Sequence, residues 1–179
     1  MESARIDCRL LFIGDERTGK SSMIRRMANL SFQEQYLPTR NILVSLLRIS
    51  LKGSLLDVNL WDTSGHPRFY LKPSKFLSGT HGVLLTFSIT DRQSFLNVPF
   101  WFLTVARMLS PIIPLLLVGT KSDLEHMRSV AFEEAKAVAD EHNCKYLEVS
   151  AKTDTNLDIA LRSLLYELLQ KRMIHVNSG

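Results

Sequence analysis

The sequence predicts an α/β protein with a mostly parallel six-stranded sheet, one antiparallel strand and helices on both faces. Apolar, strand-like runs alternate with segments of helical spacing through most of the 179 residues, which is typical of parallel strands joined by helices. Two early runs, residues 42–52 and 55–61, are separated only by Gly53-Ser54. That hairpin signal predicts the one antiparallel pairing.

The individual elements follow from the spacing of apolar residues. The first strand is expected at 8–13 and the first helix at 21–27, and the next segment, up to Thr39, is expected to be a loop because Pro38 blocks helix continuation. After the hairpin, the run 83–88 is apolar enough for a strand buried on both faces. The rest of the alternation places strands at 115–119 and 146–149 and helices at 93–109, 130–142 and 157–170.

Length and composition indicate one domain spanning residues 1–179. A chain of this length with 45% hydrophobic residues can bury a full core. The formal net charge is +4 and the basic residues are scattered along the chain, so no nucleic-acid partner is indicated. We expect a monomer.

The cysteines and the apolar runs bear on where the protein is found. Cys8 and Cys144 are too few for a disulfide framework, which favours a reducing, cytoplasmic location. No apolar stretch is long enough to span a bilayer, and the first residues begin neither a signal peptide nor a myristoylation motif. Residues 171–179 contain no cysteine for a prenyl group. We expect attachment to a membrane surface only if a lipidated tail follows this sequence.

The segment from Gly14 to Ser21 fits the pattern G-x-x-x-x-G-K-[ST] and stands between a predicted strand and a predicted helix. In that setting, backbone N–H groups converge on a polyphosphate, Lys20 reaches the terminal phosphates and Ser21 is a magnesium ligand. The alternative is a glycine turn that only joins strand to helix. The phosphate-binding interpretation assigns to the ligand Gly14, Glu16, Arg17, Thr18, Gly19, Lys20, Ser21 and Ser22.

Other polar residues follow predicted strands and are expected to meet at one edge of the sheet. Asp62 comes directly after a strand and is suited to hold magnesium through water, and Gly65 offers a bare backbone N–H to a terminal phosphate. Taken alone, Asp62 is as often a turn former. The hydroxyl of Thr39 could close on the metal when a third phosphate is present, although by itself it is only a loop threonine.

Two segments after later strands have the chemistry to recognise a purine base. Asp123 can accept two N–H groups from a guanine edge while the stem of Lys121 lies against the ring. The same carboxylate would repel the edge of adenine, which lacks that donor pair. The segment Ser150-Ala151-Lys152 supplies backbone N–H groups and another alkyl stem. Taken singly, each segment is also an ordinary turn.

These motifs stand in the order found in Ras-superfamily small GTPases, which the chain resembles over nearly its whole length. The features that look most like the Rab branch are Trp61 to Gly65, Arg68-Phe69 and residues 79–83. The resemblance implies the P-loop NTPase fold, binding of GTP or GDP with Mg²⁺ and hydrolysis of GTP. It also implies a role in vesicle traffic or signalling.

The same resemblance implies roles for particular residues. Phe32 would pack on the guanine, Tyr36 would close over the phosphates and Thr39 would bind magnesium in the GTP state. The segments around Thr39 and Gly65 would be two switches that bind effector, exchange-factor or activating proteins. Among the aromatic residues, Trp61, Phe69 and Tyr70 are candidates for a partner surface, with core packing the alternative for Trp61, and Trp101 is expected to pack within its helix.

Three residues depart from the pattern of that superfamily. His66 stands where these proteins usually carry the catalytic glutamine, and a neutral imidazole donates and accepts from two ring atoms set at a different angle. Glu16 replaces a glycine or small residue and brings a carboxylate near the γ-phosphate. Thr120 replaces an asparagine whose amide would reach the base. That amide would also tie residues 120–123, the base loop, to residues 14–21, the phosphate loop. The segment after Thr39 also lacks the hydrophobic-glycine pattern of Rabs.

These departures predict a switch that hydrolyses GTP slowly, with His66, Lys20 and Thr39 as the candidate catalytic residues. A GTP-holding scaffold with negligible turnover is one alternative. In another, Glu16 and His66 are tolerated surface substitutions and a different residue positions the water. A P-loop nucleoside kinase or ATPase is disfavoured, since no arginine-rich lid is present and Asp123 selects against adenine.

Overall fold

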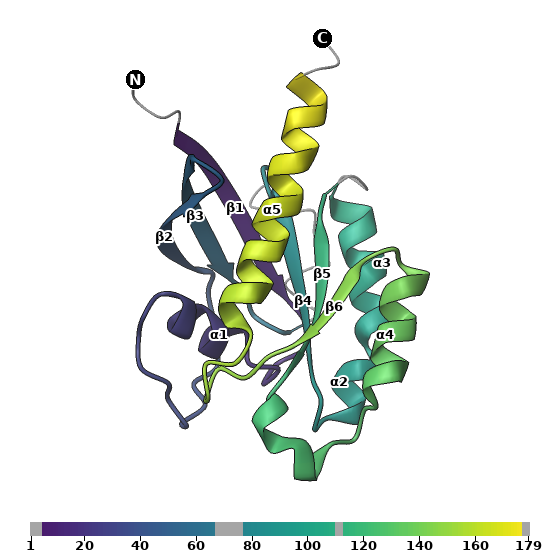
Figure 1. Ribbon diagram of the computed structural model, residues 1–179. Helices are drawn as coiled ribbons and strands as arrows, with labels where there is room; N and C mark the ends of the chain where they lie inside the picture. Colours follow the sequence, from purple (N-terminus) through teal and green to yellow (C-terminus); the bar gives the residue numbers. More distant parts are fainter. Residues whose placement is uncertain (1–4, 67–76, 110–112, 177–179) are drawn as a thin grey trace.

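A six-stranded sheet in the order β2-β3-β1-β4-β5-β6 forms the centre of the protein (Figure 1). The computed structural model describes residues 5–66, 77–109 and 113–176, with side chains for 6–66, 77–109 and 113–171. Strand β2 (Leu43–Leu51) pairs antiparallel with β3 (Ser54–Asp62), and the other pairings within this sheet are parallel. The predicted fold class is therefore confirmed.

The remaining strands lie close to their predicted positions. They are β1 (Arg5–Ile13), β4 (Gly82–Ser88), β5 (Leu115–Thr120) and β6 (Lys145–Glu148). Strand β1 begins earlier than expected because its polar first residues pair in register with β3, starting with Arg5 beside Leu55. Hydrogen bonds to β3 thus extend β1, and the spacing of apolar residues does not reveal such backbone pairing.

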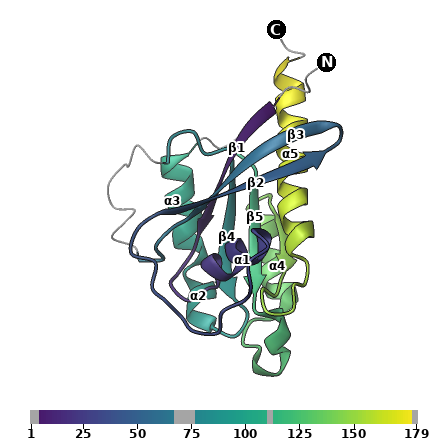
Figure 2. The same cartoon turned by 90° about the vertical axis from the view of Figure 1, so that its left-hand side faces the viewer.

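Helices cover both faces of the sheet, as Figures 1 and 2 show. One face is covered by α1 (Lys20–Met27) and α5 (Leu157–Val176), and the other by α2 (Arg92–Leu96), α3 (Val98–Met108) and α4 (Phe132–Glu141). Successive strand residues point to opposite faces. In β1, Leu10 and Phe12 therefore join the core under α1 and α5, and Leu11 and Ile13 join the core under α2, α3 and α4.

Two helical predictions need correction, and the structure adds one short helical segment. The expected helix at 93–109 is two helices that meet at Asn97, because Pro99 has no N–H to donate and its ring would clash with a carbonyl one turn earlier. Helix α5 continues to Val176 rather than ending at residue 170. A short 3₁₀ segment, η2 (Ser122–Met127), follows β5, and the apolar spacing gave no sign of it.

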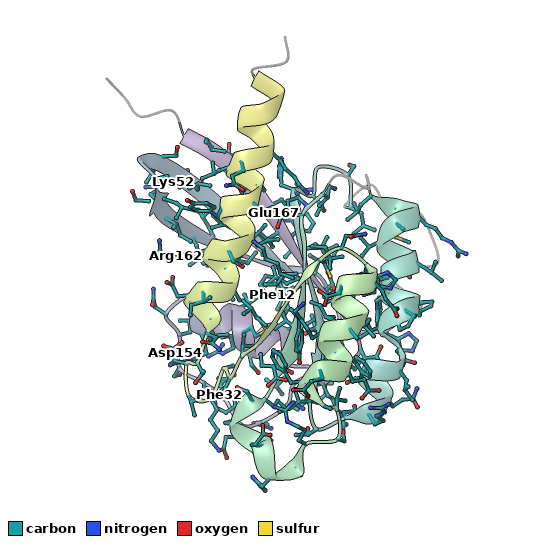
Figure 3. All side chains as sticks on the ribbon, turned by 45° about the vertical axis from the view of Figure 1, so that its right-hand side comes forward. Phe12, Phe32, Lys52, Asp154, Arg162 and Glu167 are labelled. Carbon is teal, nitrogen blue, oxygen red and sulfur yellow. The ribbon has the colours of Figure 1, made fainter. Side chains whose placement is uncertain are left out.

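The parallel strands β1, β3, β4, β5 and β6 all end at the same edge of the sheet, so the loops that follow them gather there. Figure 3 shows Phe32 at this end of the molecule and Lys52 at the opposite end. Among the helices that the structure describes, none is both long and apolar enough to cross a membrane. Cys8 and Cys144 are free thiols.

Candidate functional site

The loop between β1 and α1 presents an open helix N-terminus. Residue Gly19, with a φ of 87°, caps α1 without a side-chain hydrogen bond, and the first turn carries no acidic residue. The first N–H groups of a helix have no partner within it, and together with the helix dipole they favour an anion. The loop therefore has the local structure that a phosphate group requires.

Lys20, at the start of α1, is buried beneath this loop. Its Nζ donates to the carbonyl oxygen of Gly14 at 2.9 Å and to that of Asp15 at 2.6 Å. Burial lowers the pKa of Lys20 to about 8, and the carboxylates of Asp62, Asp15 and Glu16 oppose that change. A bound polyphosphate would favour the charged form of this ammonium group, whose hydration burial removes.

The three predicted magnesium ligands lie together at one end of the loop. The hydroxyl oxygens of Ser21 and Thr39 are 3.0 Å apart. Burial raises the pKa of Asp62, while hydrogen bonds from Ser21 and Thr39 and the charge of Lys20 lower it. The Oδ1 atom of Asp62 is buried and has no hydrogen-bond partner among the residues that the structure describes. Two hydroxyls and an unsatisfied carboxylate oxygen form a hard oxygen donor set that fits Mg²⁺.

The predicted base-binding residues lie at the other end of the same edge. The hydroxyl of Ser150 donates to Oδ1 of Asp123 at 2.6 Å, so a buried serine fixes the orientation of the carboxylate. Lys121 has a left-handed backbone, with a φ of 63°, and burial lowers the pKa of its side chain. Phe32 and Lys152 line this end of the site as well.

Thr120 keeps a tie that the sequence predicted would be lost. Its hydroxyl lies 2.6 Å from the carbonyl oxygen of Thr18 in the phosphate loop and 3.0 Å from that of Phe87. A threonine hydroxyl can thus connect the base loop to the phosphate loop, because β5 brings the two loops into direct contact. The expectation is wrong on this point.

These residues enclose a single large cavity of about 1040 Å³. The cavity is lined by residues from the loops after β1, β3, β5 and β6 and by the segment that follows α1. The predicted site residues that line it are Glu16, Arg17, Gly19, Lys20, Ser21, Ser22, Phe32, Tyr36, Thr39, Asp62, Gly65, Thr120, Lys121, Asp123, Ala151 and Lys152.

Comparison with known proteins identifies the lineage. The model of the Ras family matches residues 9–170 of the chain. The chain belongs to the Ras family of small GTPases. The GTP-binding protein ypt2 of Schizosaccharomyces pombe is 37% identical over 92% of this chain and 82% of its own length. Rab-13 of Canis lupus familiaris is 36% identical over 91% of this chain and 80% of its own length.

A plant relative gives the same result. The Ras-related protein RIC1 of Oryza sativa subsp. japonica is 36% identical over 89% of this chain and 79% of its own length. The protein is thus a small GTPase of the Rab-like type, and the predicted family and branch are confirmed.

Four predicted residues of this GTPase do not line the cavity. Gly14 and Thr18 are buried within the phosphate loop, and Ser150 lies beneath Asp123. The side chain of His66 is exposed, and its backbone N–H donates to the hydroxyl of Ser64 at 3.3 Å. The structure therefore does not bring the imidazole into the cavity.

The aromatic residues singled out in the sequence have different surroundings in the structure. Trp61 is half-buried, with the guanidinium of Arg9 4.1 Å from the centre of its ring. Trp101 is fully buried, as expected for helix packing, but its indole N–H donates to Asp15 in the phosphate loop. The predicted partner residues Phe69 and Tyr70, and the Rab-like pair Arg68-Phe69, lie outside the described residues.

Two contacts tie the segment after α1 to the opposite rim of the cavity. The carboxylate of Glu34 pairs with the ammonium of Lys152 at 3.0 Å. The guanidinium of Arg17 lies 5.0 Å from the centre of the Tyr36 ring. Neither the motifs nor the apolar spacing predicts a role for Glu34 or a contact between Arg17 and Tyr36, because each contact joins two separate loops.

Replacing Arg17 by alanine is expected to speed release of bound GDP about three-fold, because an exposed cation–π contact contributes about 0.5–1 kcal/mol. Stopped-flow displacement of fluorescent GDP measures the rate. The matched control is Lys52→Ala, which removes a cation 3.7 Å from the Tyr166 ring at the far end of the molecule (Figure 3). An equal acceleration in both variants would show that the contact between Arg17 and Tyr36 does not hold the segment closed.

Proposed function

We propose that this small GTPase is a guanine-nucleotide switch whose GTP-bound state is long-lived because Glu16 and His66 slow hydrolysis. The observation that carries the proposal is the position of Glu16. This residue lines the cavity, and its charge acts on both Lys20 and Tyr36. A carboxylate at this point would repel the charge that a phosphoryl-transfer transition state spreads over the γ-phosphate oxygens.

The proposed nucleotide lies across the whole cavity. Its phosphates would accept hydrogen bonds from the backbone N–H groups of the phosphate loop and the start of α1, and Lys20 would balance their charge. Its guanine would donate two N–H groups to Asp123 and pack between Phe32 and the stem of Lys121. The positions of these groups at the two ends of one cavity support a nucleoside di- or triphosphate as the ligand.

Ser21, Thr39 and Asp62 would hold Mg²⁺, which when bound neutralises charge on the β- and γ-phosphates. Thr39 belongs to the segment that Glu34 and Tyr36 tie across the cavity, so its contribution depends on the position of that segment. A hydroxyl that reaches the metal site in only one arrangement of the segment is what a nucleotide-dependent switch requires.

The position of His66 supports slow turnover in a second way. A water-positioning side chain must lie within hydrogen-bond reach of the attacking water beside the γ-phosphate. The His66 side chain is exposed and outside the cavity lining. An imidazole outside the cavity lining supports slow hydrolysis in this proposal.

Single-turnover hydrolysis of preloaded GTP with Mg²⁺ tests this function. We expect a wild-type rate below the intrinsic rate of Ras, which is about 3–5 × 10⁻⁴ s⁻¹. The double variant Glu16→Gly with His66→Gln is expected to be at least about ten-fold faster, because it removes the repelling carboxylate and supplies a glutamine that can orient the attacking water. Phosphate release and the identity of the bound nucleotide are both measured.

The matched control is Asp158→Asn, which removes an exposed carboxylate that pairs with Arg162 on α5 and does not line the cavity. Its hydrolysis rate is expected to equal that of the wild type. A wild-type rate as fast as that of the double variant would contradict the proposal. Retention of GTP without turnover in every variant would instead identify a GTP-holding scaffold.

Partner proteins are proposed to dock on the segment after α1 that contains Thr39, and on β2. Three apolar side chains here are between 60% and 64% exposed, those of Leu37, Leu43 and Leu46. Exposed apolar residues grouped beside a ligand cavity favour a protein interface. Effector, exchange-factor or activating proteins fit this position because they would sense whether the segment is closed. We further propose that residues 1–179 act as one monomeric domain in the cytoplasm, and at a membrane surface only through a lipidated tail.

A further inference from the structure

Asp15 places a negative charge inside an anion-binding loop. Its neighbours Glu16 and Arg17 line the cavity, whereas Asp15 does not. Its charge still acts on Lys20, the cation expected to meet the phosphates. An unrestrained carboxylate at this point of the loop would repel a polyphosphate, so the direction in which Asp15 points affects nucleotide binding.

Two donors hold that carboxylate, Asn97 at the junction of α2 and α3 and Trp101 within α3. The indole N–H of Trp101 donates to Oδ1 of Asp15 at 2.7 Å, and the side-chain amide of Asn97 donates to Oδ2 at 2.6 Å. Each carboxylate oxygen thus has its own donor. Hydrogen bonds to an ionised acceptor are about twice as strong as neutral ones, so the pair fixes both the position and the direction of the carboxylate.

The backbone of Asp15 is tied to the phosphate site at the same time. Its carbonyl oxygen accepts from Nζ of Lys20 at 2.6 Å and from the hydroxyl of Thr18 at 2.8 Å. A shift of the Asp15 side chain would therefore be passed directly to the residues that are expected to contact the phosphates. Trp101 is fully buried in the core between the sheet and α3, so the donors themselves sit on a rigid element.

We propose that Asn97 and Trp101 are positioning residues for nucleotide retention: they hold the Asp15 carboxylate away from the phosphates and so keep the phosphate loop in its binding conformation. This inference rests on the proposed guanine-nucleotide binding. It makes α3, on the opposite face of the sheet from α1 (Figure 2), part of the nucleotide site. Loss of either donor frees a carboxylate beside the phosphates and speeds release of the nucleotide.

The test is the release rate of N-methylanthraniloyl-GDP from the full chain in Mg²⁺, measured after addition of excess unlabelled GDP. Trp101→Phe keeps an aromatic ring in the core, removes the N–H donor and also leaves unfilled part of the space that the indole occupied. We expect it to release GDP about ten-fold faster, and Asn97→Ala to change the rate in the same direction, as loss of a hydrogen bond to a charged group predicts.

A second substitution separates the freed charge from damage to packing. Asp15→Asn removes the charge that Trp101→Phe is proposed to release, so the double variant Asp15→Asn/Trp101→Phe is expected to release GDP within about three-fold of Asp15→Asn alone. If the double variant is as fast as Trp101→Phe, the effect comes from core packing and the proposal is overturned.

Val98→Ala is the matched control on the same helix. Val98 is fully buried between Asn97 and Trp101 and belongs to the core that α3 covers. This variant should lower the stability of the fold while leaving the GDP release rate within about two-fold of wild type. Release from Val98→Ala as fast as from Trp101→Phe would overturn the proposal. Failure of the wild type to retain GDP would instead refute the proposed function.

Discussion

Replacing Asp123 by alanine is expected to weaken binding of both GDP and GTP about 100- to 10,000-fold. The proposed contact consists of two N–H groups donated by guanine to one carboxylate, and each such bond to a charged group contributes about 1.5–3 kcal/mol. The hydroxyl of Ser150, which donates to Asp123 at 2.6 Å, would also lose its acceptor. Equilibrium titration with fluorescent GDP and with a non-hydrolysable GTP analogue measures both affinities.

Base selectivity provides an independent check on the role of Asp123. Asp123→Asn replaces one acceptor oxygen by a donor, which suits the 2-carbonyl of xanthine, so this variant should prefer XDP to GDP. Asp154→Ala is the matched control, because it removes an exposed carboxylate paired with Arg26 near the same end of the molecule (Figure 3). If Asp123→Ala binds GDP as tightly as Asp154→Ala does, guanine is not recognised by Asp123.

Replacing Gly65 by alanine is expected to weaken GTP binding about 10- to 100-fold while changing GDP affinity by no more than about three-fold. A Cβ atom at this position would lie 2.1 Å from the backbone nitrogen of Glu16 and 2.3 Å from the carbonyl carbon of Asp15. Backbone atoms cannot yield to such an overlap, so the segment after Asp62 must move away. The N–H of residue 65 would then no longer reach the third phosphate, which GDP lacks.

The ratio of the affinities for the GTP analogue and for GDP separates loss of one phosphate contact from general destabilisation of the fold. The GTP analogue and GDP are titrated against the same variant in Mg²⁺, so a fall in folding stability affects both. Gly53→Ala serves as the control, because a Cβ at this hairpin tip would meet no atom within 4 Å. Its two affinities should match those of the wild type. Equal losses for GTP and GDP in Gly65→Ala would mean that Gly65 serves only the packing of the loop.

Local sequence patterns predicted the elements of this fold well because secondary structure follows the spacing of apolar residues. The loop from Gly14 to Ser21 was predicted from its own residues, and the edge at which Asp62 and Asp123 gather followed from the parallel topology. The boundaries were less predictable. The single helix expected at 93–109 is divided near Pro99, and the start of β1 is set by its pairing with β3.

Contacts between distant segments were not predictable from those patterns. Asp15 and Trp101 are 86 residues apart, and Glu34 and Lys152 are 118 residues apart. The hydrogen bond between Thr120 and Thr18 likewise joins two distant segments, which are 102 residues apart. The spacing of residues along one segment contains no information about which side chain of another segment will face it.

The sequence alone thus determined the class of fold, the phosphate loop and the chemical type of each site residue, because these depend on neighbouring residues and on the functional groups themselves. Only the tertiary structure decided how those groups are held. In that structure the Asp15 carboxylate accepts hydrogen bonds from Asn97 and Trp101, and Thr120 bonds to the phosphate loop. His66 does not line the cavity. Packing of helices against the sheet sets these distances, and packing depends on the whole chain.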